Sequence, residues 1–298
     1  TGTTPISMEA IQEFQIVMAP YDIKYGGFTG GGVNVITKTG TNKLHGSAFF
    51  YGRNESLARK GDSKGDLAEL SEFSETTFGL TLGGPIVKNK LFFFLSFENK
   101  DEKSQKDLNY VIDGSGNPND LGGYDAAVRF TDILKNQYGY DPGTFGPTSN
   151  AFKTMQMLAK LDWNISENHR LSFRWDMVDA EREILRRNAT WNYSWSNYAY
   201  LMENKKNSFV LQLNSVFGTN MFNELILNYT TIRDNRGPVT ENFPGVIVDS
   251  EPSINKIDMI AGSEVYSTRN QLDQDIFEVT DNFTMHLGKH TLTLGTHN

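Results

Sequence analysis

Three polar side chains in the middle of the chain have the spacing of a calcium-binding loop. Asp113, Ser115 and Asn117 stand two residues apart, as the first three oxygen ligands of such a loop do. That loop also requires glycine at its sixth position and glutamate at its twelfth. The chain has Pro118 and Tyr124 there. Because the ligand set is incomplete, we predict no metal at this loop.

The other residues that could perform catalysis or bind a metal are dispersed along the chain. His286 and His290 lie on either side of a turn rather than on one face of a helix, which disfavours a zinc pair. Serine and carboxylate residues occur outside any nucleophile motif, and the chain has no cysteine. We therefore predict no catalytic residue, no metal and no cofactor, and a protein that is not an enzyme.

An aromatic segment at positions 191–200 is the candidate ligand site. Trp and Tyr offer stiff, flat contact area with a polar edge, which suits sugars and peptide side chains when the rings are exposed. The alternative is that these rings belong to an interfacial aromatic belt or pack within a loop. The candidate ligand-contacting residues are Trp191, Tyr193, Trp195 and Tyr198.

Charge and hydrophobicity limit the class of protein further. The 298 residues carry 36 acidic and 28 basic side chains, a net charge of −8, which argues against a nucleic-acid partner. The longest apolar run, residues 91–95, is far shorter than the roughly 20 residues of a membrane helix. A membrane-spanning β-strand needs only about 9–11 residues with alternating faces.

Alternation of apolar and polar residues is the dominant pattern after position 43 and predicts β-strands. Between them, short connections with turn residues alternate strictly with long polar ones. Short turns on one side and long loops on the other are typical of an outer-membrane barrel; a soluble carbohydrate-binding β-sandwich, the alternative, does not explain the order. A further strand at 11–18 and a short helix at 124–138 are also expected. The nine barrel strands are predicted near 44–51, 78–82, 91–98, 155–164, 171–177, 209–214, 225–229, 277–283 and from 292 onward.

A glycine-rich stretch, residues 20–42, precedes these strands. It leads into an alternating strand, Val33 to Thr37, and not into a helix, so it lacks the context of a phosphate-binding loop. Clustered glycines entering a strand indicate a left-handed backbone or a close approach of two backbones. The residues predicted to form this structural turn are Tyr25, Gly26, Gly27, Gly30, Gly31 and Gly32.

This stretch closely resembles the end of the plug domain in TonB-dependent outer-membrane receptors. Within that family, the similarity is greatest to the Oar-like branch. The segments that carry it are Glu13-Phe14-Gln15-Ile16, Pro20-Tyr21-Asp22, the Gly-Phe-Thr-Gly-Gly-Gly run and Thr39-Gly40-Thr41-Asn42. The resemblance extends to Phe78–Ile86; beyond it only the rhythm of strands and loops matches.

The resemblance implies an all-β fold: a transmembrane antiparallel β-barrel, present in part, with the C-terminal part of a plug. Residues 1–42 would be the plug part and residues 43–298 the first barrel strands, with a signal peptide and a TonB-contacting segment expected upstream. The implied location is the outer membrane of a Gram-negative bacterium, with membrane lipid, a TonB-type energy-transducing complex and an extracellular nutrient as partners. The nutrient class (glycan, peptide or chelated metal) stays open, and an ungated porin or adhesin-like barrel is the alternative function.

Overall fold

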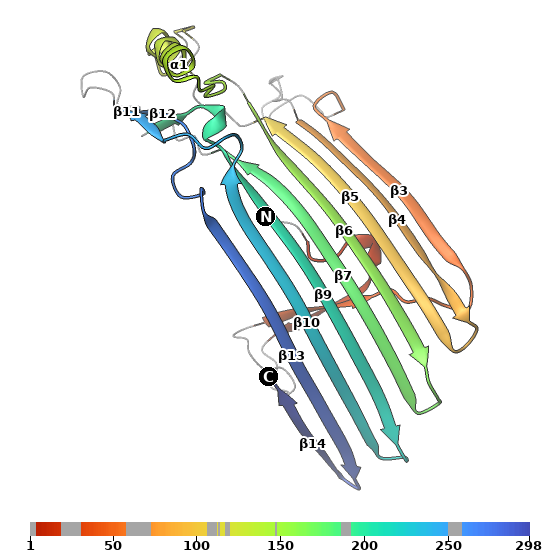
Figure 1. Cartoon of the computed structure of the whole chain (residues 1–298). Coiled ribbons are helices and arrows are strands. Elements are labelled where there is room, and N and C mark those ends of the chain that lie inside the picture. Colours follow the sequence, from red (N-terminus) through yellow and green to blue (C-terminus); the bar gives the residue numbers. More distant parts are fainter. Residues whose placement is uncertain are drawn as a thin grey trace.

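The main feature of the computed structural model is one antiparallel sheet of nine strands (Figure 1). Its order is β3-β4-β5-β6-β7-β9-β10-β13-β14, so β3 and β14 are its open edges. The predicted all-β barrel architecture and its nine strands are confirmed. The structure describes residues 4–18, 31–57, 73–105, 112, 114–116, 120–146, 148–185, 192–249 and 258–298. Tyr25, Gly26, Gly27, Gly30, Asp113, Asn117 and Trp191 lie outside the described residues.

The bounds of the elements follow the predicted strands but extend beyond them at the end with long loops. The sheet strands are β3 (His45–Asn54), β4 (Phe73–Val87), β5 (Leu91–Gln105), β6 (Ser149–Asn164), β7 (His169–Ile184), β9 (Tyr200–Phe217), β10 (Met221–Pro238), β13 (Asn270–Leu287) and β14 (His290–His297). The remaining elements are η1 (Met8–Ala10), β1 (Ile11–Met18), β2 (Gly31–Thr37), α1 (Tyr124–Tyr138), β8 (Asn192–Ser194), η2 (Ser196–Tyr198), β11 (Val246–Val248) and β12 (Asp258–Ala261).

The intervals 181–207 and 235–270, expected to be loops, are partly strand. β7 continues to Ile184, β9 begins at Tyr200, and β10 ends at Pro238. In these extensions polar side chains pair across the strands; the Arg233 guanidinium, for example, lies 2.7 Å from the Asp275 carboxylate. The backbone hydrogen-bond ladder thus continues where the apolar alternation is absent, and alternation alone predicts strands that are too short.

The two ends of the sheet differ in the length of their connections. Short turns at 88–90, 165–168, 218–220 and 288–289 gather at one end, and the long connections with α1, β11 and β12 gather at the other (Figure 1). Asn89, Gly218 and Gly288 have φ near +60°, the left-handed conformation that tight turns require.

One face of the sheet carries the N-terminal elements, and we call it the inner face. β1 and β2 pair antiparallel as a separate two-stranded sheet, which lies behind the large sheet in the view of Figure 1. The predicted strand at 11–18 matches β1, and the predicted helix at 124–138 matches α1.

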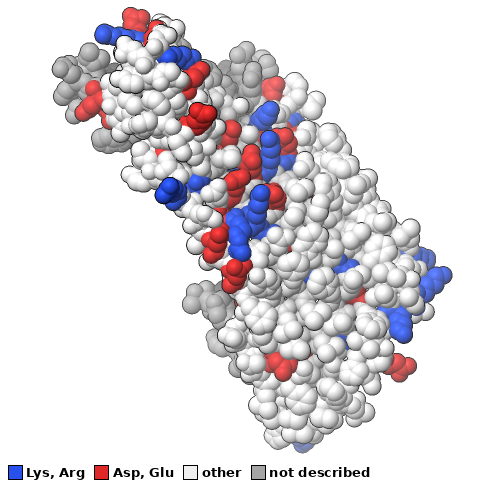
Figure 2. Space-filling model, viewed as in Figure 1, with Lys and Arg blue, Asp and Glu red and all other residues white. Residues whose placement is uncertain are grey.

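The opposite, outer face is apolar over the half of the sheet nearer the short turns. One cross-strand row joins Leu161, Phe173 and Leu211, whereas the adjacent inner row joins Asp162, Ser172 and Gln212. Figure 2 shows the outer face: charged side chains gather toward the long loops, and a broad uncharged area lies below them. This distribution is that of a strand wall with hydrocarbon outside and water inside.

The long connections pack together into a cap with its own hydrophobic core. The connections β5–β6, β7–β9 and β10–β13 contribute to it, and β12 pairs with β8 to join two of them. Within the described ranges, no helix has the length and apolarity needed to cross a membrane. The core side chains are Ile112, Ala127, Phe130, Leu134, Tyr140, Tyr193, Trp195 and Ala261.

Candidate functional site

The N-terminal segment, residues 4–10, lies directly on the inner face of β5 and β6. The side-chain amide of Gln156 donates a 2.5 Å hydrogen bond to the Thr4 carbonyl oxygen, and the Ser7 hydroxyl donates one of 2.5 Å to Glu98. A small apolar cluster supports these polar contacts. It contains Ile6, Ala10, Phe94 and Leu158.

The chain then crosses the turn end of the wall at residues 39–42. The Thr39 hydroxyl donates to the Asp162 carboxylate. A Cβ added at buried Gly40 would lie 2.3 Å from the carbonyl oxygen of Phe93, on β5, and 2.6 Å from that of Gly84, on β4. Gly40 therefore allows an approach of three backbones that any other residue would prevent.

Asn42 fixes the next step of the crossing. Its side-chain oxygen accepts a 2.7 Å hydrogen bond from the backbone N–H of Asn89, and its amide donates one of 2.5 Å to the Asn89 side chain. Asn164 donates to the Asn89 carbonyl oxygen at 3.1 Å. The N-terminal segment, the β4–β5 turn and β6 are thereby joined by one amide cluster.

Charged side chains are buried on the inner face beside this crossing. Asp162 and Asp176 are each 2% exposed. Arg170 lies 3.3 Å and Lys160 3.8 Å from Asp162, which offsets the cost of burying its charge.

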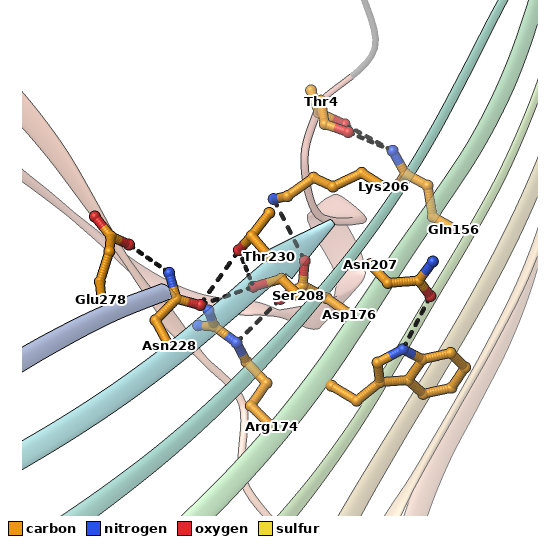
Figure 3. Close-up of polar contacts among 11 residues, drawn as sticks. Thr4, Gln156, Arg174, Asp176, Lys206, Asn207, Ser208, Asn228, Thr230 and Glu278 are labelled. Carbon is orange, nitrogen blue, oxygen red and sulfur yellow. Dashed lines mark hydrogen bonds and ion pairs between the residues drawn. The ribbon is translucent and has the colours of Figure 1, made fainter. Parts of the chain in front are cut away.

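Asp176 is compensated in the same way, by Arg174 at 3.2 Å and Lys206 at 3.6 Å. Figure 3 also shows a separate hydrogen-bonded group beside it, which joins Ser208, Thr230, Asn228 and Glu278, and the contact of Thr4 with Gln156. The Asp176 oxygens lack hydrogen-bond geometry to the described residues, so the two cations hold this carboxylate by charge alone.

The glycine stretch differs from its predicted role at Gly32. We expected Gly30 to Gly32 to be crowded or left-handed. Gly31 and Gly32 instead begin β2, paired with Met18 and Val17, and a Cβ at Gly32 would meet no atom of the described residues within 4 Å. This expectation is wrong for Gly32, which lies near the start of β2 and pairs only with β1. The close approach of backbones occurs eight residues later, at Gly40.

The expected exposure of the aromatic segment also needs correction. Tyr193 is 1% and Trp195 0% exposed, because both rings fill the core of the cap. The Trp195 indole donates a 2.9 Å hydrogen bond to Thr131 on α1, and the Tyr193 hydroxyl donates one of 2.5 Å to the Phe145 carbonyl oxygen. Tyr198, in η2, is half-buried and retains surface for a ligand.

A charged pair orders the end of α1 in the cap. Asp141 accepts a 2.9 Å hydrogen bond from the Gly143 N–H and lies 3.1 Å from the Lys135 ammonium. The backbone hydrogen bond, and to a lesser degree Lys135, hold the pKa of Asp141 below its usual value. Burial raises the pKa of the neighbouring Tyr140. In the described part of the chain, no group of three or more His, Asp or Glu side chains could hold a metal ion.

Taken together, the apolar outer face, the charged inner face, the short-turn end and the capped end define an outer-membrane β-barrel wall with a segment lying against its inside. Comparison with known proteins agrees. A family model described as "Outer membrane beta barrel domain" matches residues 36–114 and 126–297.

Two relatives with similar sequences are named TonB-dependent proteins. The TonB-dependent transporter Oar of Myxococcus xanthus is 29% identical over 183 residues, 58% of this chain and 16% of its own length. The probable TonB-dependent siderophore receptor PirA of Acinetobacter baumannii is 35% identical over 109 residues, 36% of this chain and 13% of its own length. The crystal structure of the outer membrane transporter YddB from Escherichia coli covers 98% of this chain with a TM-score of 0.63, at 10% identity. This chain covers 35% of YddB.

The chain therefore belongs to the outer membrane β-barrel domain family, in the class of TonB-dependent receptors of the Gram-negative outer membrane. It matches only 16% of the length of Oar and 13% of the length of PirA.

Proposed function

We propose that the complete protein imports a nutrient across the outer membrane through a lumen that residues 1–42 help to close, as the end of a plug. Residues 43–298 would form part of the surrounding barrel. The observation that carries this proposal is the crossing at Gly40, which leads the N-terminal segment onto the inner face of the sheet. A loop that only lay exposed on the surface would not be expected to make such close backbone contact with two barrel strands.

The contacts of the segment suit a plug that can be displaced. They consist of a few hydrogen bonds, such as Thr4–Gln156, Ser7–Glu98 and Thr39–Asp162, and a small apolar cluster. Individual hydrogen bonds of this kind contribute only about 0.5–1.5 kcal/mol net, because water replaces the lost partner. A TonB-type energy-transducing complex pulling on the plug is the proposed partner that breaks them.

The cap is the proposed first contact for the nutrient. Its core fixes three long connections relative to one another, which lowers the entropy lost on binding. Among the aromatic candidates, Tyr198 offers accessible surface on this cap, and Trp191 remains a proposed contact. Glycans, peptides and chelated metals are the proposed substrate classes, and ferric chelates gain support because one relative is named a siderophore receptor.

The proposal is tested by growth of a deletion strain, complemented with the full-length protein, on a panel of glycans, peptides and iron chelates as limiting nutrients. We expect growth on at least one of them, lost when the TonB complex is also deleted. Growth restored equally without the TonB complex would instead identify an ungated porin. Unchanged growth on every nutrient combined with altered cell adhesion would identify an adhesin-like barrel.

A further inference from the structure

A cavity of about 360 Å³ lies between the N-terminal segment and the inner faces of β3–β6. Its lining combines carboxylates with aromatic rings, a composition that recurs where proteins bind organic cations. The carboxylates are Glu9, Glu75 and Glu98, and the rings are Phe49, Tyr51 and Phe152.

The strand register brings two of its polar residues close together. On the inner face, Glu98 of β5 stands opposite Gln156 of β6, and Lys100 stands opposite Thr154. Glu98 and Thr154 are thus diagonal neighbours across one strand pair, about 7–8 Å apart. A single small group can therefore contact both side chains.

The charged side chains of the cavity wall on β3, β4 and β5, other than Glu98, neutralise one another. Lys100 Nζ lies 2.8 Å from Glu75 and 3.0 Å from Glu102, and Arg53 Nε lies 2.7 Å from Glu75. Two cations and two anions therefore form a neutral chain across β3, β4 and β5.

Glu98 stands outside this chain of charges. Among the ion pairs of the described residues none involves Glu98, whose carboxylate accepts a hydrogen bond only from the neutral Ser7 hydroxyl. Glu9 is 3.8 Å from Lys38, a long contact between half-exposed groups that is screened by water. The uncompensated charge of the cavity is therefore negative and lies at Glu98.

Thr154 provides the second polar group. It is 6% exposed, it lines the cavity, and its hydroxyl oxygen has no hydrogen-bond partner among the described residues. A buried hydroxyl without a partner costs free energy. A donor entering the cavity would recover that free energy.

We propose that this cavity binds a primary alkylammonium group. One N–H donates to the Glu98 carboxylate and a second to Thr154 Oγ1, while the alkyl stem lies against the aromatic rings. An ammonium carries three donors and no acceptor, which matches two acceptors and a negative potential. The site goes beyond the proposed uptake, since it binds its ligand in the resting protein without energy coupling.

The test uses the purified full-length protein in detergent, titrated with n-butylammonium and followed by ligand-observed NMR. Butyrate and n-butanol are the anionic and neutral probes of the same length. We expect saturable binding of n-butylammonium alone. Glu98→Gln should weaken it at least tenfold, and the isosteric Thr154→Val should weaken it severalfold.

Glu278→Gln is the matched control, because Glu278 is another inner-face carboxylate that accepts a side-chain hydrogen bond, from Asn228 at 2.6 Å. It should leave binding unchanged. Absence of n-butylammonium binding to the wild-type protein, or equal binding to all three variants, overturns the proposal. If Glu98→Gln does not fold, unchanged binding to Thr154→Val overturns it as well. Loss of TonB dependence in growth would defeat the proposed function but would leave this binding result untouched.

Discussion

Gly40 and Phe93 approach each other so closely that a Cβ on residue 40 would stand 2.3 Å from the Phe93 carbonyl oxygen. Contacts of this length between a methyl group and a backbone oxygen do not occur without a shift of one backbone. The N-terminal segment can therefore enter the inner face along this path only with glycine at position 40.

Gly40→Ala should consequently displace the N-terminal segment while the nine strands remain paired. Overpacking of this kind costs about 1–3 kcal/mol. Protease sensitivity of residues 4–42 should rise in the folded, membrane-inserted protein. Gly32→Ala is the control, because a Cβ there meets no atom of the described part of the chain within 4 Å; equal sensitivity in the two variants would refute the crossing.

Leu211→Arg should destabilise the barrel far more than Gln212→Arg. Leu211 belongs to the outer row, and Gln212 faces inward, where its amide donates a 2.9 Å hydrogen bond to Glu224. An arginine facing hydrocarbon at the membrane midplane costs about 2–4 kcal/mol, and less near the interfaces. Folding yields of the two full-length variants in lipid vesicles measure the difference; similar yields would mean that the faces are exchanged.

The two ends of the sheet should face opposite sides of the outer membrane and should therefore differ in their accessibility from outside the cell. Asn242 is exposed in the capped end, and Asn168 is exposed in the short β6–β7 turn. In the full-length protein on intact cells, Asn242→Cys should react with a membrane-impermeant thiol reagent and Asn168→Cys should not. The reverse labelling would invert the barrel in the membrane.

Trp195→Ala should unfold the cap without unfolding the sheet. The ring is fully buried and packs edge-on against Phe130, with 5.1 Å between ring centroids. Removal of a large buried aromatic side chain costs about 3–5 kcal/mol. Hydrogen exchange should accelerate in α1 but not in β9 or β10. Tyr266→Ala, at a position that is 76% exposed, should change neither.

Acid should loosen the end of α1 through Asp141. The pKa of Asp141 is lowered in the folded cap, so its contribution to stability is complete above its unfolded pKa of about 3.9 and is lost as the pH falls through the folded value. Hydrogen exchange at residues 135–143 should therefore rise as the pH falls below about 4. In Asp141→Asn it should already be raised at pH 6 and should change less with acid. An identical acid response in both proteins would show that another group is responsible.

The sequence predicted the wall of the barrel well, because alternation records which side of a strand meets lipid. Leu171, Phe173 and Trp175 against Ser172, Arg174 and Asp176 give the two faces of β7 without further information. The strand ends toward the cap were predicted too short, because polar side chains there pair with one another and leave no alternating pattern.

The inner-face site could not be predicted in the same way. Gly40 is one of 27 glycines, and its role depends on the backbones of Gly84 and Phe93, more than 40 positions away. Similarly, the sequence around Tyr193 and Trp195 does not reveal that α1, over 50 positions upstream, covers both rings. Sequence patterns report local burial, whereas these contacts join segments through the tertiary fold.

The conductance of the full-length protein in planar lipid bilayers tests the central claim most directly. Closure of the lumen by the N-terminal part predicts little steady conductance from the intact protein. A deletion of all residues up to Asn42 should give large, stable open channels. An intact protein that conducts as much as this deletion would contradict the account, because the segment on the inner face would then close nothing.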